Sequence, residues 1–416
     1  MKAPRHRPQL KVFVIMSLEL EVAKQAAREA GRVIIHHSSM INTDEALMSL
    51  VDRSLQAEVV ALDTEFFWER TYRPQLGVIQ LGLSEEECFL IDVLAIPDLT
   101  PLGRLLASPS VVKILHDAQQ DLTILHHATG AFPKNIFDTR RAAGFAGMIS
   151  TISLQDLLSD MLGIALAKDE TRSNWLRRPL SSKQMKYALD DVHYLGALRD
   201  ELLARTQARG FSTWLEEDLA AYDDPTLYQD NDARERYHRV KGWGRLNARE
   251  LAVLRELTAW REHEAGRQDR PRGHVLQDQA LVELAQLQPR STAGFKRMDS
   301  YFEHQIRRCQ DAIVQVVATG LAVTDEDCPR PSERPSGLRQ IRAQVDAALI
   351  HMREKAEEID LDPALVGSRA EFTSLIAKGA EAKAEHHRLL RGWRREFIGE
   401  ELLKSMQGET VDSISF

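Results

Sequence analysis

Four acidic residues and one tyrosine have types and spacings that suit the hydrolysis of a phosphodiester. Carboxylate oxygens are the hard ligands that Mg²⁺ prefers, together with phosphate and water. A pair of such ions can stabilise both the attacking and the leaving oxygen of a phosphodiester. The sequence therefore favours a site for two divalent cations, Mg²⁺ or Mn²⁺. The five residues are Asp63, Glu65, Asp121, Tyr187 and Asp191.

The first two acids directly follow an apolar, β-branched run at 59–62, which is typical of a buried strand. Alternation along a strand predicts that Asp63 and Glu65 lie on one face and Thr64 on the other. Two carboxylates side by side at the end of a buried strand are costly unless a cation or a proton neutralises them. A metal explains the pair, and the competing interpretation is a strand that ends in solvated acids.

The third acid follows another apolar run, at 111–115, and lies beside the apolar stripe of an expected helix. An acid near the first turn is also favoured by the helix dipole, which is the structural interpretation of Asp121. The adjacent pair His116-Asp117 suggests an alternative class, the HD phosphohydrolases. That class needs further metal ligands on neighbouring helices, and the nearby candidate is the pair at 126–127.

The last two residues belong to an expected helix that begins with a capping box at 181–184 and continues to about residue 208. Tyr187 and Asp191 are four residues apart, so they lie on one face of that helix. Asp190 lies about 100° away around the axis. A tyrosine next to an acid of this kind can orient a water molecule, and its structural interpretation is a half-buried aromatic on an amphipathic helix.

Three segments resemble the three motifs of the DEDD superfamily of 3′-to-5′ exonucleases, in the subgroup with a tyrosine in the third motif. The segments are DTEF (63–66), HDAQQDL (116–122) and YALDD (187–191). The chain further resembles the ribonuclease D family over roughly 40–405, with extended similarity at 70–82 and 168–195.

The resemblance implies roles for the residues that match these motifs. Asp63, Glu65, Asp121 and Asp191 would be the metal ligands, and Tyr187 would position the nucleophilic water. It also implies a 3′-to-5′ exoribonuclease that trims structured RNAs, above all tRNA precursors, and releases nucleoside 5′-monophosphates. A DNA-directed exonuclease and a non-catalytic RNA-binding scaffold are the alternatives, and the scaffold would be expected to lack at least one acid.

The expected fold class is α/β plus all-α. Apolar runs predict strands at 59–65, 76–83, 88–92, 111–115 and 135–138, with helices after the fourth and the fifth. The first two strands could pair antiparallel across 66–75. The resemblance implies a ribonuclease H-like mixed sheet at the centre of this exonuclease domain.

Two small helical units are expected after this domain. A capping box at 247–250 begins a helix of about 20 residues, and the segment 275–285 is echoed by 365–376. Both units resemble the HRDC (helicase and ribonuclease D C-terminal) domains, which bind nucleic acid. The expected division is an exonuclease domain at 40–210, a connector at 211–233, a first HRDC domain at 234–327, a linker at 328–335, and a second HRDC-like domain with a tail at 336–416. Residues 1–39 are either a genuine extension or the product of an upstream start codon.

Composition and charge fit a nucleic-acid enzyme once their distribution is considered. The net charge is −8, yet 234–308 holds 16 lysines and arginines against 10 acids. The three cysteines have no metal-ligand or disulfide spacing, which favours a reducing cytoplasm. No apolar run of about 18 residues predicts a membrane span. We expect a monomer whose partner is RNA with a free 3′ end.

Overall fold

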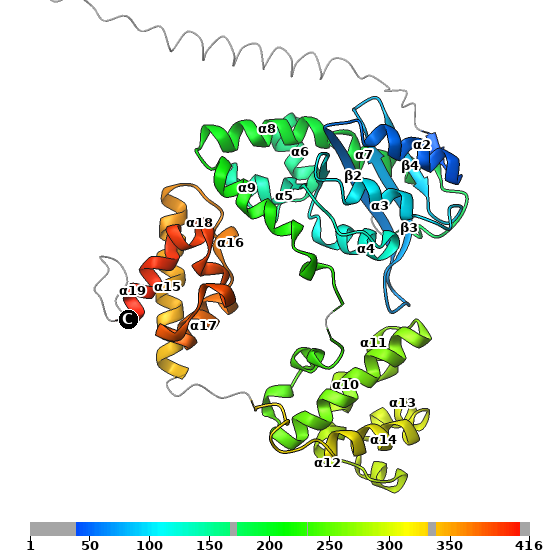
Figure 1. The fold of residues 1–416 in the computed structure, drawn as a ribbon, viewed down its shortest axis with the longest axis vertical. Helices are drawn as coiled ribbons and strands as arrows, with labels where there is room; N and C mark the ends of the chain where they lie inside the picture. Colours follow the sequence, from blue (N-terminus) through cyan, green and yellow to red (C-terminus); the bar gives the residue numbers. More distant parts are fainter. Residues whose placement is uncertain (1–38, 167–172, 231, 332–337, 408–416) are drawn as a thin grey trace, which may run out of the picture.

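The computed structural model describes residues 39–166, 173–230, 232–331 and 338–407. An α/β domain is followed by a first helical unit (232–331) and a C-terminal helical unit (338–407), as the sequence predicts (Figure 1). Apart from Ser39, the expected N-terminal extension lies outside the described residues.

A six-stranded mixed sheet forms the centre of the α/β domain, in the order β1-β4-β3-β2-β5-β6. Strand β2 pairs antiparallel with β3 and parallel with β5, so the strand that carries the first two acids is central. All five predicted strands are confirmed, and β1 was not predicted because three residues are too few to show a period. The strands are β1 (Ser39–Ile41), β2 (Val59–Phe67), β3 (Gln75–Gly82), β4 (Cys88–Asp92), β5 (Val112–Leu115) and β6 (Ile136–Asp138).

Helices cover both faces of the sheet, and each face has its own apolar core. On one face lie α2 (Asp44–Ser54), α3 (Thr100–Leu106) and α4 (Gln119–Thr129). On the other lie α5 (Thr139–Phe145), α6 (Leu154–Leu162), α7 (Ser182–His193), α8 (Leu195–Ala208) and α9 (Ser212–Ala220).

The prediction of a single helix that continues to about residue 208 was wrong, because the segment is divided at Tyr194 into α7 and α8. Its predicted start is confirmed, since Ser181 and Gln184 form the capping box. Helix α7 packs on β2, β3 and β4, whereas α8 packs on β2 and β5 and on α5 and α6. Tertiary packing of the two halves therefore sets the break, and no local sequence signal marks it.

The two helical units repeat one arrangement of a long, a short and a medium helix. In the first unit these are α10 (Ala248–Gln268), α11 (Arg272–Val275) and α12 (Asp278–Leu287), followed by α13 (Glu303–Arg307) and α14 (Gln310–Leu321). In the C-terminal unit they are α15 (Leu338–Glu358), α16 (Pro363–Val366) and α17 (Arg369–Lys378), followed by α18 (Gly392–Arg394) and α19 (Glu400–Met406). The capping box predicted for α10 forms between Asn247 and Glu250.

The two units differ in how they join the α/β domain. The first unit has a core of its own, whereas the core of the C-terminal unit is continuous with that of the sheet face covered by α5 to α9. Trp393 stacks on Trp214 of α9 at 5.0 Å between ring centroids and meets Phe145 of α5 edge-on at 5.5 Å. The segment 211–233, expected as a connector, also buries Tyr222 and Tyr228 in the core beneath α4.

Candidate metal centre

Three of the five predicted residues meet beside the second half of β2. Carboxylate oxygens of Asp63, Glu65 and Asp191 lie within 4.8 Å of one another. Asp63 and Glu65 project from the central strand, and Asp191 comes from α7, which packs across β2, β3 and β4. The neighbouring Asp190 is held by Lys186 at 2.5 Å and takes no part in the cluster.

The fourth acid lies outside this group of three, on the helix that covers the opposite face of the sheet, and its charge acts on Asp63. Asp121 lies on α4 and is 9% exposed, and its carboxylate accepts a hydrogen bond from the hydroxyl of Thr64. Thr64 lies on the face opposite Asp63 and Glu65, as the alternation predicts, and its buried hydroxyl contacts Asp121. The sequence signal was a buried polar hydroxyl between two acids.

Burial of these acids makes their charged forms unfavourable. Burial, and then Asp121, Asp191 and Glu65, raise the pKa of Asp63 well above its ordinary value. Burial, and then the charges of Asp191 and Asp121, raise the pKa of Glu65 to about 9. Burial raises the pKa values of Asp121 and Asp191 to about 7 each. Without cations, the cluster therefore retains protons at neutral pH.

The donor set fits a pair of hard divalent cations. It consists of carboxylate oxygens alone, without a cysteine or a histidine. Gln80 of β3 lies directly opposite Asp63 in the antiparallel register, so the two side chains share a face. Gln80 is fully buried, and within the described residues neither polar atom of its amide has a hydrogen-bond partner. Such a group is expected beside a site that is completed by further ligands.

Tyr187 lies one turn before Asp191 on the same face of α7. The side chain is half-buried, and its ring centroid lies 6.2 Å from that of Trp175, which is 1% exposed. The packing against Trp175 fixes the ring one helical turn from Asp191.

The alternative of an HD phosphohydrolase is wrong, because its residues are engaged elsewhere. His116 contacts the hydroxyl of Thr139 at 2.9 Å and the carbonyl of Ile152 at 3.1 Å through its two ring nitrogens. Asp117 forms an ion pair with Arg140. His126, in the last turn of α4, contacts the carbonyl of residue 131 in the loop that follows, at 3.0 Å. The first two side chains hold the turn before α4, and His126 holds the end of that helix.

Comparison with known proteins assigns the chain to a family. Residues 38–207 match the model of a 3′-5′ exonuclease domain, and residues 250–317 match that of an HRDC domain. The ribonuclease D of Desulfotalea psychrophila is 43% identical over 364 residues, which cover 86% of this chain and 96% of that protein. The chain belongs to the ribonuclease D family.

Further ribonuclease D proteins agree over nearly the same span. That of Pseudomonas paraeruginosa is 37% identical over 84% of this chain and 92% of its own length. The crystal structure of Escherichia coli RNase D, described as an exoribonuclease involved in structured RNA processing, superimposes with a TM-score of 0.81. It is 27% identical and covers 89% of this chain and 99% of that chain.

Membership of the ribonuclease D family makes the chain a 3′-to-5′ exoribonuclease with a ribonuclease H-like catalytic domain and an HRDC domain. Family members with this exonuclease domain use divalent metals, in agreement with the acidic cluster. Among the described residues, no helix is both long and apolar enough to span a membrane.

Proposed function

We propose that the chain trims the 3′ ends of structured RNAs, tRNA precursors above all, one nucleoside 5′-monophosphate at a time. The observation that carries this proposal is the convergence of three carboxylates within 4.8 Å beside the central strand, in a chain of the ribonuclease D family. Ribonuclease D of Escherichia coli is described as acting in structured RNA processing, which supports the choice of substrate.

In this proposal Asp63, Glu65, Asp121 and Asp191 hold two divalent ions, Mg²⁺ or Mn²⁺. When bound, the ions supply a stronger nucleophile at neutral pH and stabilise the charge on the leaving 3′ oxygen. The chain's own contribution is to hold four carboxylates where like charges repel, so that cation binding is strongly favoured. Thr64 orients Asp121 by its hydrogen bond to that carboxylate.

Tyr187 is proposed to position the attacking water, as in the tyrosine subgroup of the DEDD exonucleases. Its support is the position on α7, one turn before Asp191, with the ring held against Trp175. A hydroxyl at this place can accept or donate a hydrogen bond to a water in line with the terminal phosphate.

The first helical unit is proposed to hold the body of the RNA. A cavity of about 500 Å³ in this unit is lined by Arg236, Arg239, Lys241, Arg261 and Arg272, among others. Arg236, Arg261 and Arg272 pair with acids of the unit. Within the described part of the chain, the side chains of Arg239 and Lys241 form no ion pair, so they are free to bind phosphates.

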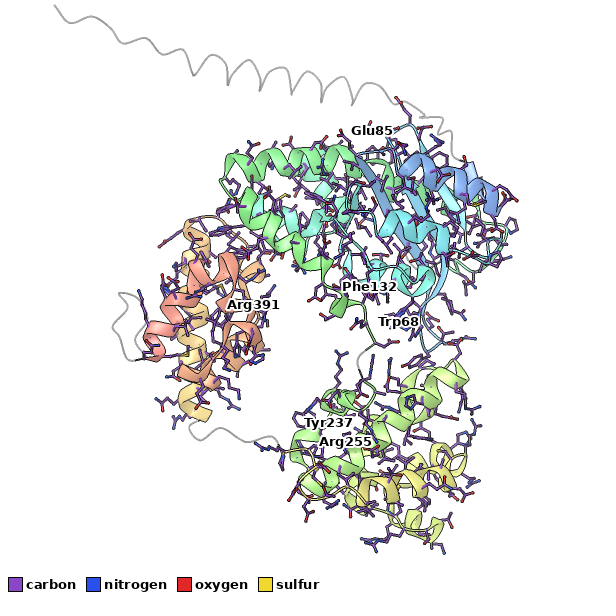
Figure 2. The ribbon with its side chains drawn as sticks, in the orientation of Figure 1. Trp68, Glu85, Phe132, Tyr237, Arg255 and Arg391 are labelled. Atoms are coloured by element: carbon purple, nitrogen blue, oxygen red, sulfur yellow. The ribbon has the colours of Figure 1, made fainter. Side chains whose placement is uncertain are left out.

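A second cavity, of about 580 Å³, connects this basic surface with the catalytic domain. It is lined by Arg239 and Arg272 of the first unit and by Trp68 and Gln120, which adjoins Asp121. Figure 2 shows Trp68 at the edge of the catalytic domain that faces the first unit. The side chain of Trp68 is 52% exposed, and an exposed indole is a platform on which an RNA base can stack.

The remaining organisation is proposed on the same grounds. The C-terminal unit is a second HRDC-like domain, since its first three helices begin 90 or 91 residues after their counterparts in the first unit. We place the boundaries near residues 40, 210, 234, 327 and 336. The enzyme is proposed to act as a monomer in the cytoplasm.

The test is the degradation of a 5′-labelled tRNA precursor, a single-stranded RNA and a DNA of the same sequence, with Mg²⁺ or EDTA. We expect products shortened stepwise from the 3′ end of the RNAs with Mg²⁺, release of nucleoside 5′-monophosphates, and no degradation with EDTA. Faster degradation of the DNA would contradict the RNA substrate. RNA binding without hydrolysis would favour the alternative of a non-catalytic RNA-binding scaffold.

A further inference from the structure

A chain of buried and partly buried hydrogen bonds joins the C-terminal helical unit to the start of α4, the helix that carries Asp121. We propose that Arg394 of the C-terminal unit positions Asp121 through this chain. The C-terminal unit then serves metal binding and turnover, whereas the first helical unit serves RNA affinity. The inference rests on the proposed role of Asp121 as a metal ligand. The hydrogen-bond chain runs through Arg394, Asp218, Arg141, Tyr222 and Asp138.

The start of α4 lacks a cap of its own. Its N-cap residue is Ala118, which has no side chain that could accept a hydrogen bond. The preceding Asp117 has a φ of 60°, in the left-handed region that is unfavourable for residues other than glycine. This turn therefore needs support from outside the helix, and Asp121 follows it within one helical turn.

Asp138, at the end of β6, supplies that support. Its two carboxylate oxygens accept the backbone N–H groups of Asp117 and Ala118, both at 3.1 Å. The same carboxylate caps α5 by accepting the backbone N–H of Arg140 at 2.9 Å. Asp138 is 1% exposed, so its position and charge decide the geometry of the turn before α4.

Tyr222 holds the Asp138 carboxylate by a hydrogen bond. The Tyr222 hydroxyl donates to Asp138 Oδ2 at 2.5 Å, and its oxygen accepts from Arg141 Nε at 2.9 Å. Because the oxygen accepts from Arg141, the hydroxyl proton is directed to Asp138. Arg141 in turn donates to Asp218 Oδ2 at 2.7 Å, and its guanidinium lies 4.9 Å from the centre of the Tyr222 ring.

Arg394 closes the chain from the C-terminal unit. It donates to the second oxygen of Asp218 and to the backbone carbonyl of Leu365 at 2.7 Å. Arg394 is 4% exposed and Asp218 is 3% exposed, so the pair is shielded from water. Removing Arg394 would leave a buried carboxylate with a single cationic partner, and Arg141 would be drawn from Tyr222 toward Asp218.

The surrounding contacts hold Arg394 in place. The neighbouring Trp393 stacks on Trp214 of α9, and its backbone N–H donates to Glu217 at 2.9 Å. Figure 1 shows α18 of the C-terminal unit beside α9 of the sheet domain. Side chains therefore connect Arg394 to Asp138, and the backbone N–H groups of Asp117 and Ala118 continue the link to the start of α4. The network lines a cavity of about 220 Å³.

The test uses the full-length enzyme with Tyr222→Phe and Arg394→Ala. Tyr222→Phe removes one hydroxyl and keeps the packing, so it reports on the link even where Arg394→Ala impairs folding. Arg209→Ala is the matched control, because Arg209 also binds the C-terminal unit, at Asp360 and the carbonyl of Ile359. Within the described residues it forms no hydrogen bond with a member of the chain from Arg394 to Asp138. Each variant is examined by hydrogen exchange of residues 117–125 without metal, by Mn²⁺ calorimetry, and by kcat and KM on a tRNA precursor.

We expect Tyr222→Phe and Arg394→Ala to increase exchange at 117–125, to weaken Mn²⁺ binding and to lower kcat by roughly 10- to 100-fold, the usual range for groups that orient metal ligands, with little change in KM. Arg209→Ala should leave these quantities near the wild type. Wild-type exchange and kcat in Tyr222→Phe would overturn the inference, as would equal losses in Arg209→Ala. A wild-type enzyme without metal-dependent hydrolysis would instead contradict the proposed function.

Discussion

The clustered acids beside β2 carry an electrostatic cost that cations would remove. Burial raises the pKa of Glu65 to about 9 and that of Asp191 to about 7. These groups take up protons on folding without metal, so protonation stabilises the metal-free fold. Cations compete with those protons, so metal binding and pH are linked in this enzyme.

The metal-free enzyme should lose stability as pH rises. The raised pKa values stabilise the fold fully below about pH 4, and this stabilisation is lost as pH passes through about 7 to 9. We expect the Tm in EDTA to fall by roughly 5 °C or more between pH 5 and pH 9. Excess Mg²⁺ should restore the Tm at pH 8 and have little effect at pH 5. A Tm in EDTA that is independent of pH, or Mg²⁺ stabilisation that is larger at pH 5, would show that protonation of these acids is not linked to folding and metal binding.

Tyr187→Phe separates a catalytic from a structural tyrosine. The variant keeps the ring against Trp175 and deletes the hydroxyl, so the Tm should change little while kcat falls by roughly one to three orders of magnitude. Tyr194→Phe, just beyond the end of α7, is the control and should retain activity. A lowered Tm with an unchanged rate per folded molecule would make Tyr187 a packing residue.

At the residue scale, the sequence predicted the acids but not the residues that contact and orient them. Asp63 and Glu65 could be placed on one face because strand alternation is local, and Asp191 because helix periodicity is local. Thr64 contacts Asp121, which lies 57 residues later in the chain, and Gln80 lies opposite Asp63 on the neighbouring strand. No local sequence pattern predicts either pairing. Asp138 likewise caps a helix that begins 19 residues earlier in the chain.

At the scale of elements, the site depends on α4 and α7, which approach β2 from opposite faces of the sheet. Strand β2 was predicted nearly in full, since its apolar run is bounded and central. The capping boxes of α7 and α10 were also predicted, because their residues lie three apart. The division at Tyr194 could not be predicted, since it follows from the two surfaces on which α7 and α8 pack.

Thr64→Val tests the contact between β2 and α4. Valine keeps the shape of threonine and removes the hydroxyl that donates to Asp121, so the carboxylate of Asp121 loses an orienting partner. We expect roughly 10-fold weaker metal binding and lower kcat, measured by Mn²⁺ calorimetry and steady-state kinetics. Thr64→Ser, which keeps the hydroxyl, should restore most of both. Identical values for valine and serine would show that the contact is incidental.

At the scale of the whole molecule, the two helical units have different relations to the catalytic domain. The echo between 275–285 and 365–376 predicted a repeated unit, and the matching helix lengths agree. The sequence did not predict that the C-terminal unit shares its core with α5 and α9, because the apolar residues at that contact follow an ordinary helical pattern. Sequence periodicity identifies a buried face but not its partner.

Replacing both Arg239 and Lys241 with alanine should weaken the hold on RNA. Phosphate contacts release counterions, so the salt dependence of binding should become shallower, by about 1.5 in log-log slope for two lost contacts. The KM for a tRNA precursor should rise, and kcat should stay near the wild type. Arg307→Ala is the control, since Arg307 already pairs with Glu303 outside the basic cavity. An unchanged slope and KM would assign the first unit another role.

The measurement that tests the metal centre most directly is the rate of 3′-end trimming by Asp63→Asn. Asparagine keeps the size of Asp63 and removes its negative charge from the group of three carboxylates. With Mg²⁺ and a 5′-labelled tRNA precursor, we predict loss of turnover while RNA binding in Ca²⁺ remains near that of the wild type. A residual rate above about a hundredth of the wild type, a barrier difference of under about 3 kcal/mol, would contradict a two-cation site built on Asp63.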